Sequence, residues 1–268
     1  MTDPATDLSR YAGEHPERTL GRRVVVSRET ASTHDDARRL ARSLGAEAHG
    51  LVVTTLEQTG GRGTRGRTWW SPPGSSLALS VVWAPRPPLA RPAALTLAAA
   101  LAVLRSGAAT GASLAIRWPN DVVTEDGRKV AGVLAESVGT ESPVHLVGIG
   151  VNVLDPASPP PVPIDRPYAS LVGAGASSVP PADWFPVLLD ALGVAFRELA
   201  APDGVARLAR AFGERSWLSG RTVTLRRGDV VARGIFLGLT PALEVTLDEG
   251  AARPTRWPGE QVELVDWR

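Results

Sequence analysis

The sequence predicts an α/β protein in which a mixed sheet is flanked by helices and followed by a small all-β barrel. Three observations favour this architecture. Short β-branched runs alternate with helical segments up to about residue 217. Beyond that point, short strands and tight turns continue to the end without a helical pattern. A chain of 268 residues with 43% hydrophobic content is also long enough for a substantial core.

The first two thirds of the chain predict strands and helices in turn. Residues 1–20 are polar and lack periodicity, so we expect a flexible tail there. A helix should follow Ser32 and Thr33, because apolar residues recur at helical spacing until Gly45 ends the run. Further helices are predicted at 92–107, 184–200 and 204–212, strands at 22–28, 51–56, 76–83, 114–117, 130–137 and 145–153, and loops at 154–163 and 173–181.

After Trp217 the pattern becomes that of a β-barrel of about 50 residues. A Gly228-Asp229 pair predicts a tight turn. The strands expected around it are 222–226, 231–239, 243–247 and 260–265. We therefore expect three parts: a tail (1–20), a main domain (21–217) and a carboxy-terminal barrel (218–268).

Composition restricts the classes of function. A formal net charge of +1 gives no electrostatic case for nucleic-acid binding. The absence of cysteine excludes disulfides, thiolate metal sites and a cysteine nucleophile, and fits a reducing compartment. The start of the chain lacks the layout of a secretion signal. The longest apolar run, 93–104, is too short to cross a bilayer, which needs about 20 residues. These features predict a soluble, cytoplasmic protein.

The strongest chemical signal is Gly60 to Arg67, which has four glycines and three arginines. Glycines let a backbone approach a ligand closely and present N–H groups to an anion. Arginine forks suit phosphate or carboxylate oxygens. The run lacks the Gly-Lys-Ser/Thr ending of a Walker loop, and the prolines that follow prevent it from opening a dinucleotide-binding helix. An exposed arginine-rich turn is the alternative.

Lys129 is the only lysine of the chain: Lys and Arg total 29, so the other 28 are arginine. A position that remained lysine suits a compact ammonium where a guanidinium does not fit, although chance survival on a surface is the alternative. Upstream, Arg117-Trp-Pro-Asn-Asp121 offers either ordinary turn chemistry or oxygens for Mg²⁺. Downstream, Gly148 to Val153 is a strand whose glycines leave room for a flat group, or a buried strand with a bulge.

Together, and in this order, these segments resemble the biotin protein ligase family. The family's Gly/Arg loop, Trp-Pro-Asn-Asp turn, Lys-x-Ala-Gly strand and Gly-Ile-Gly-x-Asn strand correspond here to residues 61–67, 117–121, 129–136 and 148–152. A Ser-Thr-Asn segment corresponds to Ser32-Thr33-His34, and the glutamine ahead of the loop is Gln58. The resemblance covers about residues 22–268. It implies a class II synthetase-like α/β catalytic domain followed by an SH3-like barrel.

The resemblance also implies a two-step reaction. Biotin and ATP first form biotinyl-5'-AMP and pyrophosphate, and a lysine of a biotin carboxyl carrier domain then takes the biotin and releases AMP. Because an anionic carboxylate must approach an anionic triphosphate, the site needs positive charge aimed at the reacting oxygens. The expected substrates are ATP and biotin with Mg²⁺, and the expected partner is a biotin-dependent carboxylase. We expect a monomer or weak homodimer that binds neither DNA nor membrane.

Residue roles follow from the matched positions. Lys129 and Arg62 would be catalytic. The biotin pocket would be lined by Ser32, Thr33, Gln58, Gly61, Arg62, Gly63, Lys129 and Gly132. ATP would contact Arg62, Arg65, Arg67, Trp118, Asn120, Asp121, Lys129 and Asn152. Mg²⁺ would lie at Asn120 and Asp121. Trp69 and Trp118 are candidate apolar walls, with core packing as the alternative.

Three positions depart from the family pattern. Thr64 replaces an arginine associated with retention of the adenylate, so retention could be leakier unless Arg65 compensates. His34 replaces an asparagine, which affects the shape of the biotin pocket. Arg117 replaces a lysine, which suggests that this position accepts any cation.

Other functions remain open at this point. A lipoate–protein ligase shares the fold and the adenylation chemistry, although Gln58 and the Ser32-Thr33 pair suit a polar ureido ring. A non-catalytic regulator would bind biotin and repress transcription. Some members do so through an amino-terminal winged helix, for which about 20 residues leave no room. A degenerate carrier-binding module is disfavoured because Arg62, Asn120 and Lys129 are all present.

Overall fold

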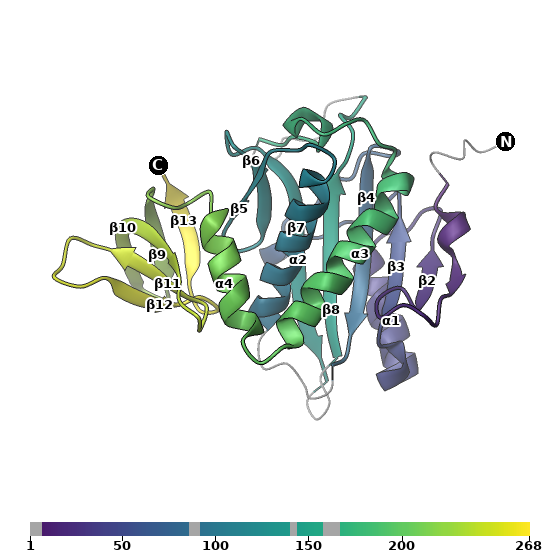
Figure 1. Cartoon of the computed structure of the whole chain (residues 1–268), viewed down its shortest axis with the longest axis horizontal. Coiled ribbons are helices and arrows are strands. Elements are labelled where there is room, and N and C mark those ends of the chain that lie inside the picture. Colours follow the sequence, from purple (N-terminus) through teal and green to yellow (C-terminus); the bar gives the residue numbers. More distant parts are fainter. Residues whose placement is uncertain (1–6, 86–91, 140–143, 158–166) are drawn as a thin grey trace.

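The computed structural model describes residues 7–85, 92–139, 144–157 and 167–268 (Figure 1). An eight-stranded sheet runs in the order β1-β2-β3-β4-β8-β7-β6-β5. Its strands are β1 (Gly13–Glu14), β2 (Arg23–Val26), β3 (Leu51–Thr55), β4 (Ser76–Trp83), β5 (Leu114–Arg117), β6 (Asp121–Thr124), β7 (Lys129–Val138) and β8 (Val144–Asn152). The β2–β3 pair is parallel and the other pairs are antiparallel, which confirms the predicted mixed sheet.

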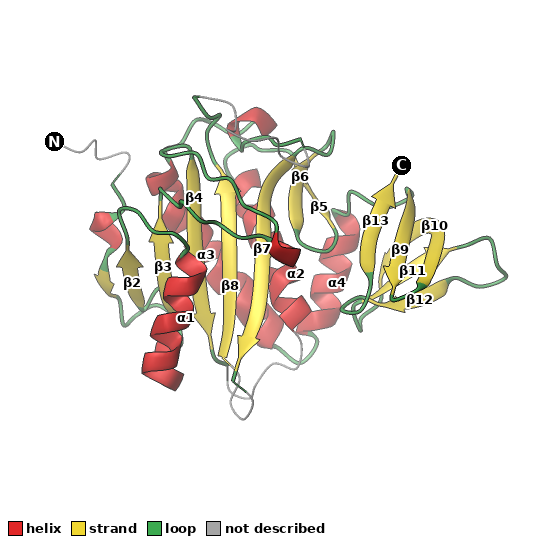
Figure 2. Ribbon diagram, turned by 180° about the vertical axis from the view of Figure 1, so that it is seen from behind, coloured by secondary structure: helices red, strands yellow, loops and turns green. Residues whose placement is uncertain are grey.

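Helices cover both faces of this sheet. One face carries α2 (Pro92–Ala108), α3 (Pro181–Ala200) and α4 (Gly204–Glu214), and the other carries α1 (Thr33–Leu44) (Figures 1 and 2). Helix α1 ends before Gly45 as predicted and begins one residue earlier than predicted, at Thr33, because the Ser32 hydroxyl caps it by accepting from the Asp35 N–H at 3.3 Å. Among the described residues, no helix combines the length and apolarity needed to span a membrane.

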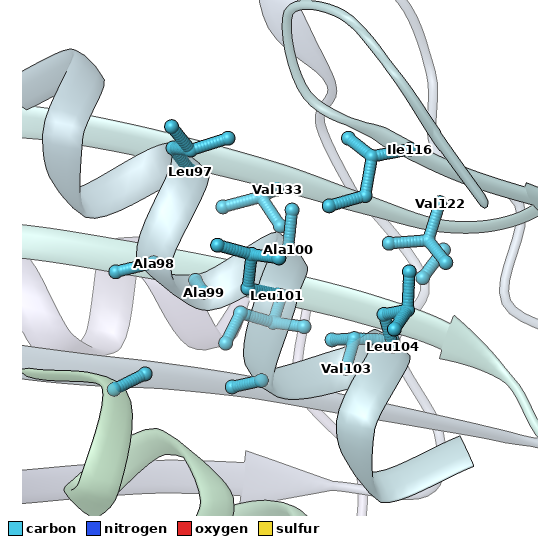
Figure 3. Close-up of a cluster of buried hydrophobic side chains, with 14 of the residues drawn as sticks. Leu97, Ala98, Ala99, Ala100, Leu101, Val103, Leu104, Ile116, Val122 and Val133 are labelled. Atoms are coloured by element: carbon cyan, nitrogen blue, oxygen red, sulfur yellow. The ribbon is translucent and has the colours of Figure 1, made fainter. Parts of the chain in front are cut away.

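The main core lies between α2 and the sheet. Because α2 is apolar on nearly every side, it sits inside the protein with Leu101 only 2% exposed. Figure 3 shows Leu104 of α2 beside Val122 of β6, with Leu101, Ile116 and Val133 in the same buried cluster. Each large aliphatic side chain buried in this way contributes about 1.5–3 kcal/mol of transfer free energy. This core fixes the strands that carry the candidate site on the opposite face.

The carboxy-terminal part is a five-stranded antiparallel sheet in the order β12-β11-β10-β9-β13. Its strands are β9 (Thr222–Arg227), β10 (Val230–Leu239), β11 (Glu244–Asp248), β12 (Thr255–Pro258) and β13 (Glu263–Trp267). Phe236 of β10 packs edge-on against Phe212 of α4, with ring centroids 6.3 Å apart. The linker after α4 pairs with β5 through the bonds Ile116 N–H to Arg215 O and Trp217 N–H to Ile116 O.

The structure differs from the sequence prediction at several short elements. The predicted tail contains a 3₁₀ turn (Ser9–Tyr11) and β1, and Leu8 and Leu20 are buried in the main core. Strands β6 and β12, of four residues each, pair with strands next to them in the chain and were not predicted, because so short a run carries a weak local signal. The predicted loop at 173–181 includes a 3₁₀ turn and the start of α3. Part of the predicted loop at 154–163 lies outside the described residues.

Candidate active site

Three glycines form the platform of the candidate site, on the face of β7 and β8 that α1 covers. The indole of Trp69 lies on Gly132 and Gly150, where a Cβ on Gly150 would be 2.4 Å from Trp69 Cε2. His34 lies on Gly148, where a Cβ would be 2.7 Å from its Nδ1. Glycine is required at these positions because flat side chains rest directly on the backbone. Trp69 therefore forms part of the wall of the site, which is one of its two predicted roles, the other being core packing.

Lys129 reaches this platform because of a β-bulge. Val122 opposes Ala131 but Val123 opposes Lys129, so Val130 is the extra residue in β7. A bulge changes the face on which the next side chain emerges. As a result Lys129 lies on the same side as Gly132, where a Cβ would be 3.1 Å from its Nζ. The ammonium is 5.3 Å from the centre of the Trp69 ring and the side chain is 25% exposed, so it does not point into bulk solvent.

Asp121 holds the Lys129 ammonium. Its Oδ1 lies 2.6 Å from Lys129 Nζ, and its Oδ2 accepts from Arg117 Nη2 at 2.9 Å. Burial would raise the pKa of Asp121, but the two cations outweigh it and hold the pKa below its ordinary value. The carboxylate is therefore charged and balanced inside the protein.

The two predicted Mg²⁺ ligands, Asn120 and Asp121, already have protein partners in the structure. Both carboxylate oxygens of Asp121 face cations, and Asn120 uses its amide N–H to donate to the Val133 carbonyl at 2.9 Å. Among the described residues, no group of three acidic or histidine side chains lies close enough to hold a metal ion. The assignment of Asn120 and Asp121 as Mg²⁺ ligands stays a prediction.

Polar groups gather at the end of the platform next to α1. The Thr33 N–H donates to Gln58 Oε1 at 2.9 Å, and the Thr33 and Ser80 hydroxyls are 3.0 Å apart. Ser32 caps the helix at the same place. Sequence reasoning found Ser32, Thr33 and Gln58 but missed Ser80. The available signal was one hydroxyl in the middle of the apolar strand β4.

His34 is the most buried titratable group of this polar end, at 7% exposure. Burial lowers the pKa of its imidazole, although the Glu136 carboxylate, 3.4 Å from Nε2, opposes that shift. A neutral imidazole therefore stands at this wall of the cavity.

The glycine- and arginine-rich loop crosses above the platform. Arg62 pairs with Asp35 at the start of α1, and Arg65 pairs with Glu263 of β13. Arg65 has a positive φ of 61°, which is unusual for a residue with a side chain. Two arginines of the loop thus contact carboxylates of different elements, Arg62 on α1 and Arg65 on β13.

Two adjoining cavities occupy this region and share Thr64 and Asn120. The first, of about 50 Å³, is lined by residues that include Ser32, Thr33, His34, Gln58, Arg62, Gly63, Ser80, Lys129 and Gly132. The second, of about 250 Å³, lies between the loop and the small sheet, and its lining includes Arg65, Arg67, Trp118, Leu239 and Glu260. The first is smaller than typical ligand pockets of roughly 300–1,000 Å³, so we expect the loop to move when a ligand enters.

Three predicted site residues line neither cavity. Gly61 is packed against Gln58 and the Trp69 backbone, Asp121 lies behind Lys129, and Asn152 donates to the Ala169 carbonyl at 3.1 Å. In the structure they support the residues that face the cavities. The structure brings the other predicted site residues to one cavity or the other.

Comparison with known proteins identifies the family. Residues 26–153 match the model of the biotin/lipoate A/B protein ligase family. A biotin–[acetyl-CoA-carboxylase] ligase from Paracoccus denitrificans is 35% identical over 240 residues, which cover 84% of this chain and 93% of that protein. The chain belongs to the biotin/lipoate A/B protein ligase family.

Further family members support this placement. A biotin–[acetyl-CoA-carboxylase] ligase from Mycobacterium tuberculosis is 36% identical over 59% of this chain and 58% of that protein. The biotin protein ligase of Aquifex aeolicus, solved with biotin and ATP, has the same fold, with a TM-score of 0.75 and 22% identity. That match covers 90% of this chain and 98% of the solved chain. The expected mixed sheet flanked by helices and followed by a small β domain is therefore confirmed.

Proposed function

We propose that this family member is a biotin protein ligase that forms biotinyl-5'-AMP from biotin and ATP and transfers biotin to a lysine of a carrier domain. The observation that carries the proposal is the placement of the sole lysine. Its ammonium stands at the wall of a cavity that has polar groups at one end and arginines above it. Such a cation lowers the repulsion between two anionic substrates.

The two cavities suggest where each substrate binds. The first offers Ser32, Thr33, Gln58 and Ser80 to a polar head group, with Gly132 beneath and Gly63 above. The second offers Arg65, Arg67 and Trp118 to the nucleotide. Asn120 and Thr64 stand where the cavities meet, close to Lys129. We propose that the biotin carboxylate and the α-phosphate react at this junction.

Arg62 would change partners during the reaction. Its guanidinium pairs with Asp35 in an exposed contact, and such surface pairs stabilise proteins by about 1 kcal/mol or less. An incoming carboxylate or phosphate can therefore replace Asp35 at small cost. Thr64 cannot supply the charge of the arginine that it replaces, whereas Arg65 lines the adjoining cavity and is placed to compensate.

The remaining assignments stay predictions. The carrier is a biotin carboxyl carrier domain of a biotin-dependent carboxylase, consistent with the name of the Paracoccus relative. We also retain the cytoplasmic location, the monomer or weak homodimer, and the catalytic domain at 21–217 with the barrel at 218–268.

The decisive experiment is ATP–pyrophosphate exchange with biotin and with lipoate side by side. We expect pyrophosphate exchange with biotin and no exchange with lipoate. We also expect biotin to be attached to a purified carrier domain. Exchange with lipoate alone would assign the chain to the lipoate branch of its family. Biotin binding without exchange would indicate a regulator. A gel shift with DNA at physiological salt should show no complex.

A further inference from the structure

Arg117 occupies a buried position next to the proposed catalytic lysine, and its contacts are specific. It is 3% exposed. Its Nη2 donates to Asp121 Oδ2 at 2.9 Å and its Nη1 donates to the Gly127 carbonyl at 3.0 Å. One guanidinium thus fixes both the carboxylate that holds Lys129 and the turn that leads into β7.

The flat face of the same guanidinium meets the small sheet. The Arg117 Cζ lies 4.7 Å from the centre of the Trp267 ring and 5.8 Å from that of Trp217. The two indoles are edge-on to each other, with centroids 6.4 Å apart. Trp267 belongs to β13, the edge strand of the small sheet that lies towards α4 and β5 (Figures 1 and 2).

Trp217 brings the linker between the sheets into this contact. Its ring N–H donates to the Glu125 carbonyl at 2.9 Å, and its ring leaves no space for a Cβ on Gly127. Arg221 covers its other side, with Cζ 3.9 Å from the ring centre. A continuous series of contacts therefore leads from β13 through Arg117 and Asp121 to Lys129.

We propose that Arg117 and Trp267 are positioning residues through which the carboxy-terminal sheet fixes the direction of the Lys129 ammonium. The proposal rests on the function proposed above for Lys129. A guanidinium can donate in its plane to Asp121 and Gly127 while it stacks on an indole, whereas an ammonium has no flat face. The proposal therefore makes arginine at position 117 a specific choice, in contrast to the expectation that this position accepts any cation.

A double-mutant cycle tests this coupling. Trp267→Leu should lower the maximal rate of biotin-dependent pyrophosphate exchange about tenfold, with the biotin KM changed less than about twofold, because a small misplacement of a reacting group is costly. Trp267→Phe keeps an aromatic face, so its exchange rate should fall less. In an Arg117→Lys background, Trp267→Leu should lower the exchange rate little further, since the guanidinium that stacks on the indole is already absent.

Trp257→Leu is the matched control. Trp257 is a partly buried tryptophan of the same small sheet, on β12, and its ring N–H donates to the Thr255 hydroxyl. The substitution should lower thermal stability by an amount similar to Trp267→Leu and leave the exchange rate unchanged. Equal rate losses in the two variants, or the same Trp267→Leu loss in both backgrounds at position 117, would overturn the proposal.

A second readout needs no activity. Because Lys129 is the only lysine, protein labelled with lysine that carries ¹³C at the ε-carbon alone gives one ε-methylene resonance in a heteronuclear NMR spectrum. The ammonium lies 5.3 Å from the Trp69 ring, so its resonance senses a change of position through the ring current. We expect the resonance to shift in Trp267→Leu and to stay in place in Trp257→Leu.

The two readouts separate failure of this inference from failure of the proposed function. A wild-type protein without biotin-dependent exchange would reject the ligase function, while the NMR comparison would still test the positioning. A lysine resonance that is the same in wild type and Trp267→Leu would reject the positioning, whatever the exchange activity.

Discussion

At the scale of single residues, Lys129 is placed both by a bulge in its own strand and by the side chains around it. The bulge turns it towards Gly132, Asp121 lies 2.6 Å from its ammonium, and Trp69 lies beside it. Each contact suits a slender cation. A planar guanidinium needs more width than the glycine platform and the indole leave.

Lys129→Arg should therefore lower biotin-dependent pyrophosphate exchange roughly hundredfold while the fold stays intact, because the charge remains but its position changes. The exchange assay measures the loss, and near-ultraviolet circular dichroism checks the fold. Arg128→Lys is the control, since Arg128 is the exposed neighbour that pairs with Asp126. Near-normal exchange by Lys129→Arg would remove the central role of this residue.

His34 should make the stability of the protein depend on pH. Burial holds its folded pKa below the ordinary value, so the unfolded chain takes up a proton at higher pH than the folded protein. Its contribution to the free energy of unfolding is complete above about pH 6.5 and is lost as the pH falls towards the folded pKa. The slope from one such group reaches at most about 1.4 kcal/mol per pH unit.

His34→Asn removes the titrating group from this position. Denaturant unfolding between pH 7 and 5 should show a shallower fall in stability for the variant than for wild type. Burial also lowers the pKa values of His49 and His145, so part of the slope should remain. Identical slopes for the two proteins would show that His34 is protonated equally in the folded and unfolded states.

At the scale of elements, β7 and β8 combine two tasks. Val133 and Ile149 face the core with 2% and 3% exposure, while Gly132, Gly148 and Gly150 form the platform on the other face. Alternation along a strand separates the two faces, so the glycines do not weaken the core. The glycines are needed because Trp69 and His34 rest directly on the backbone.

Gly150→Ala should displace Trp69, because the added methyl would lie 2.4 Å from its ring. We expect a stability loss of about 1–3 kcal/mol, as for overpacking, together with weaker biotin binding. Denaturant unfolding and calorimetric titration measure the two effects. Gly213→Ala in α4 is the control, since a Cβ there meets nothing within 4 Å and alanine favours a helix. Equal stability of the two variants would contradict the platform.

At the scale of the whole molecule, the two sheets act as one body around the second cavity. The linker pairs with β5, Phe212 packs on Phe236, and Arg65 pairs with Glu263. The cavity takes its lining from both sheet regions. The position of the small sheet therefore shapes the proposed nucleotide site.

Phe236→Ala should weaken this connection most. Phe236 is fully buried between β10 and α4, and such truncations cost about 3–5 kcal/mol. Wild type should unfold in one calorimetric transition, and the variant should show an earlier, separate transition for the small sheet. Val231→Ala, at an exposed position of the same strand, serves as the control. A loss below about 1 kcal/mol for Phe236→Ala would contradict the coupling.

The sequence by itself determined the parts whose signals are local. Periodicity and capping residues located α1 between Ser32 and Gly45, and β-branched runs located β4 and β5 at their observed bounds. The order of the glycine, arginine and asparagine motifs indicated the family, which the comparisons confirm. These features depend on residues close together in the chain.

Only the tertiary structure decided the features that depend on register and on distant partners. The bulge that turns Lys129, the pairing of Asp121 with two cations, and the contact of Arg117 with Trp267 follow from strand pairing across the fold. A one-residue change of register reverses the face of every side chain, and no local pattern in the sequence records that choice.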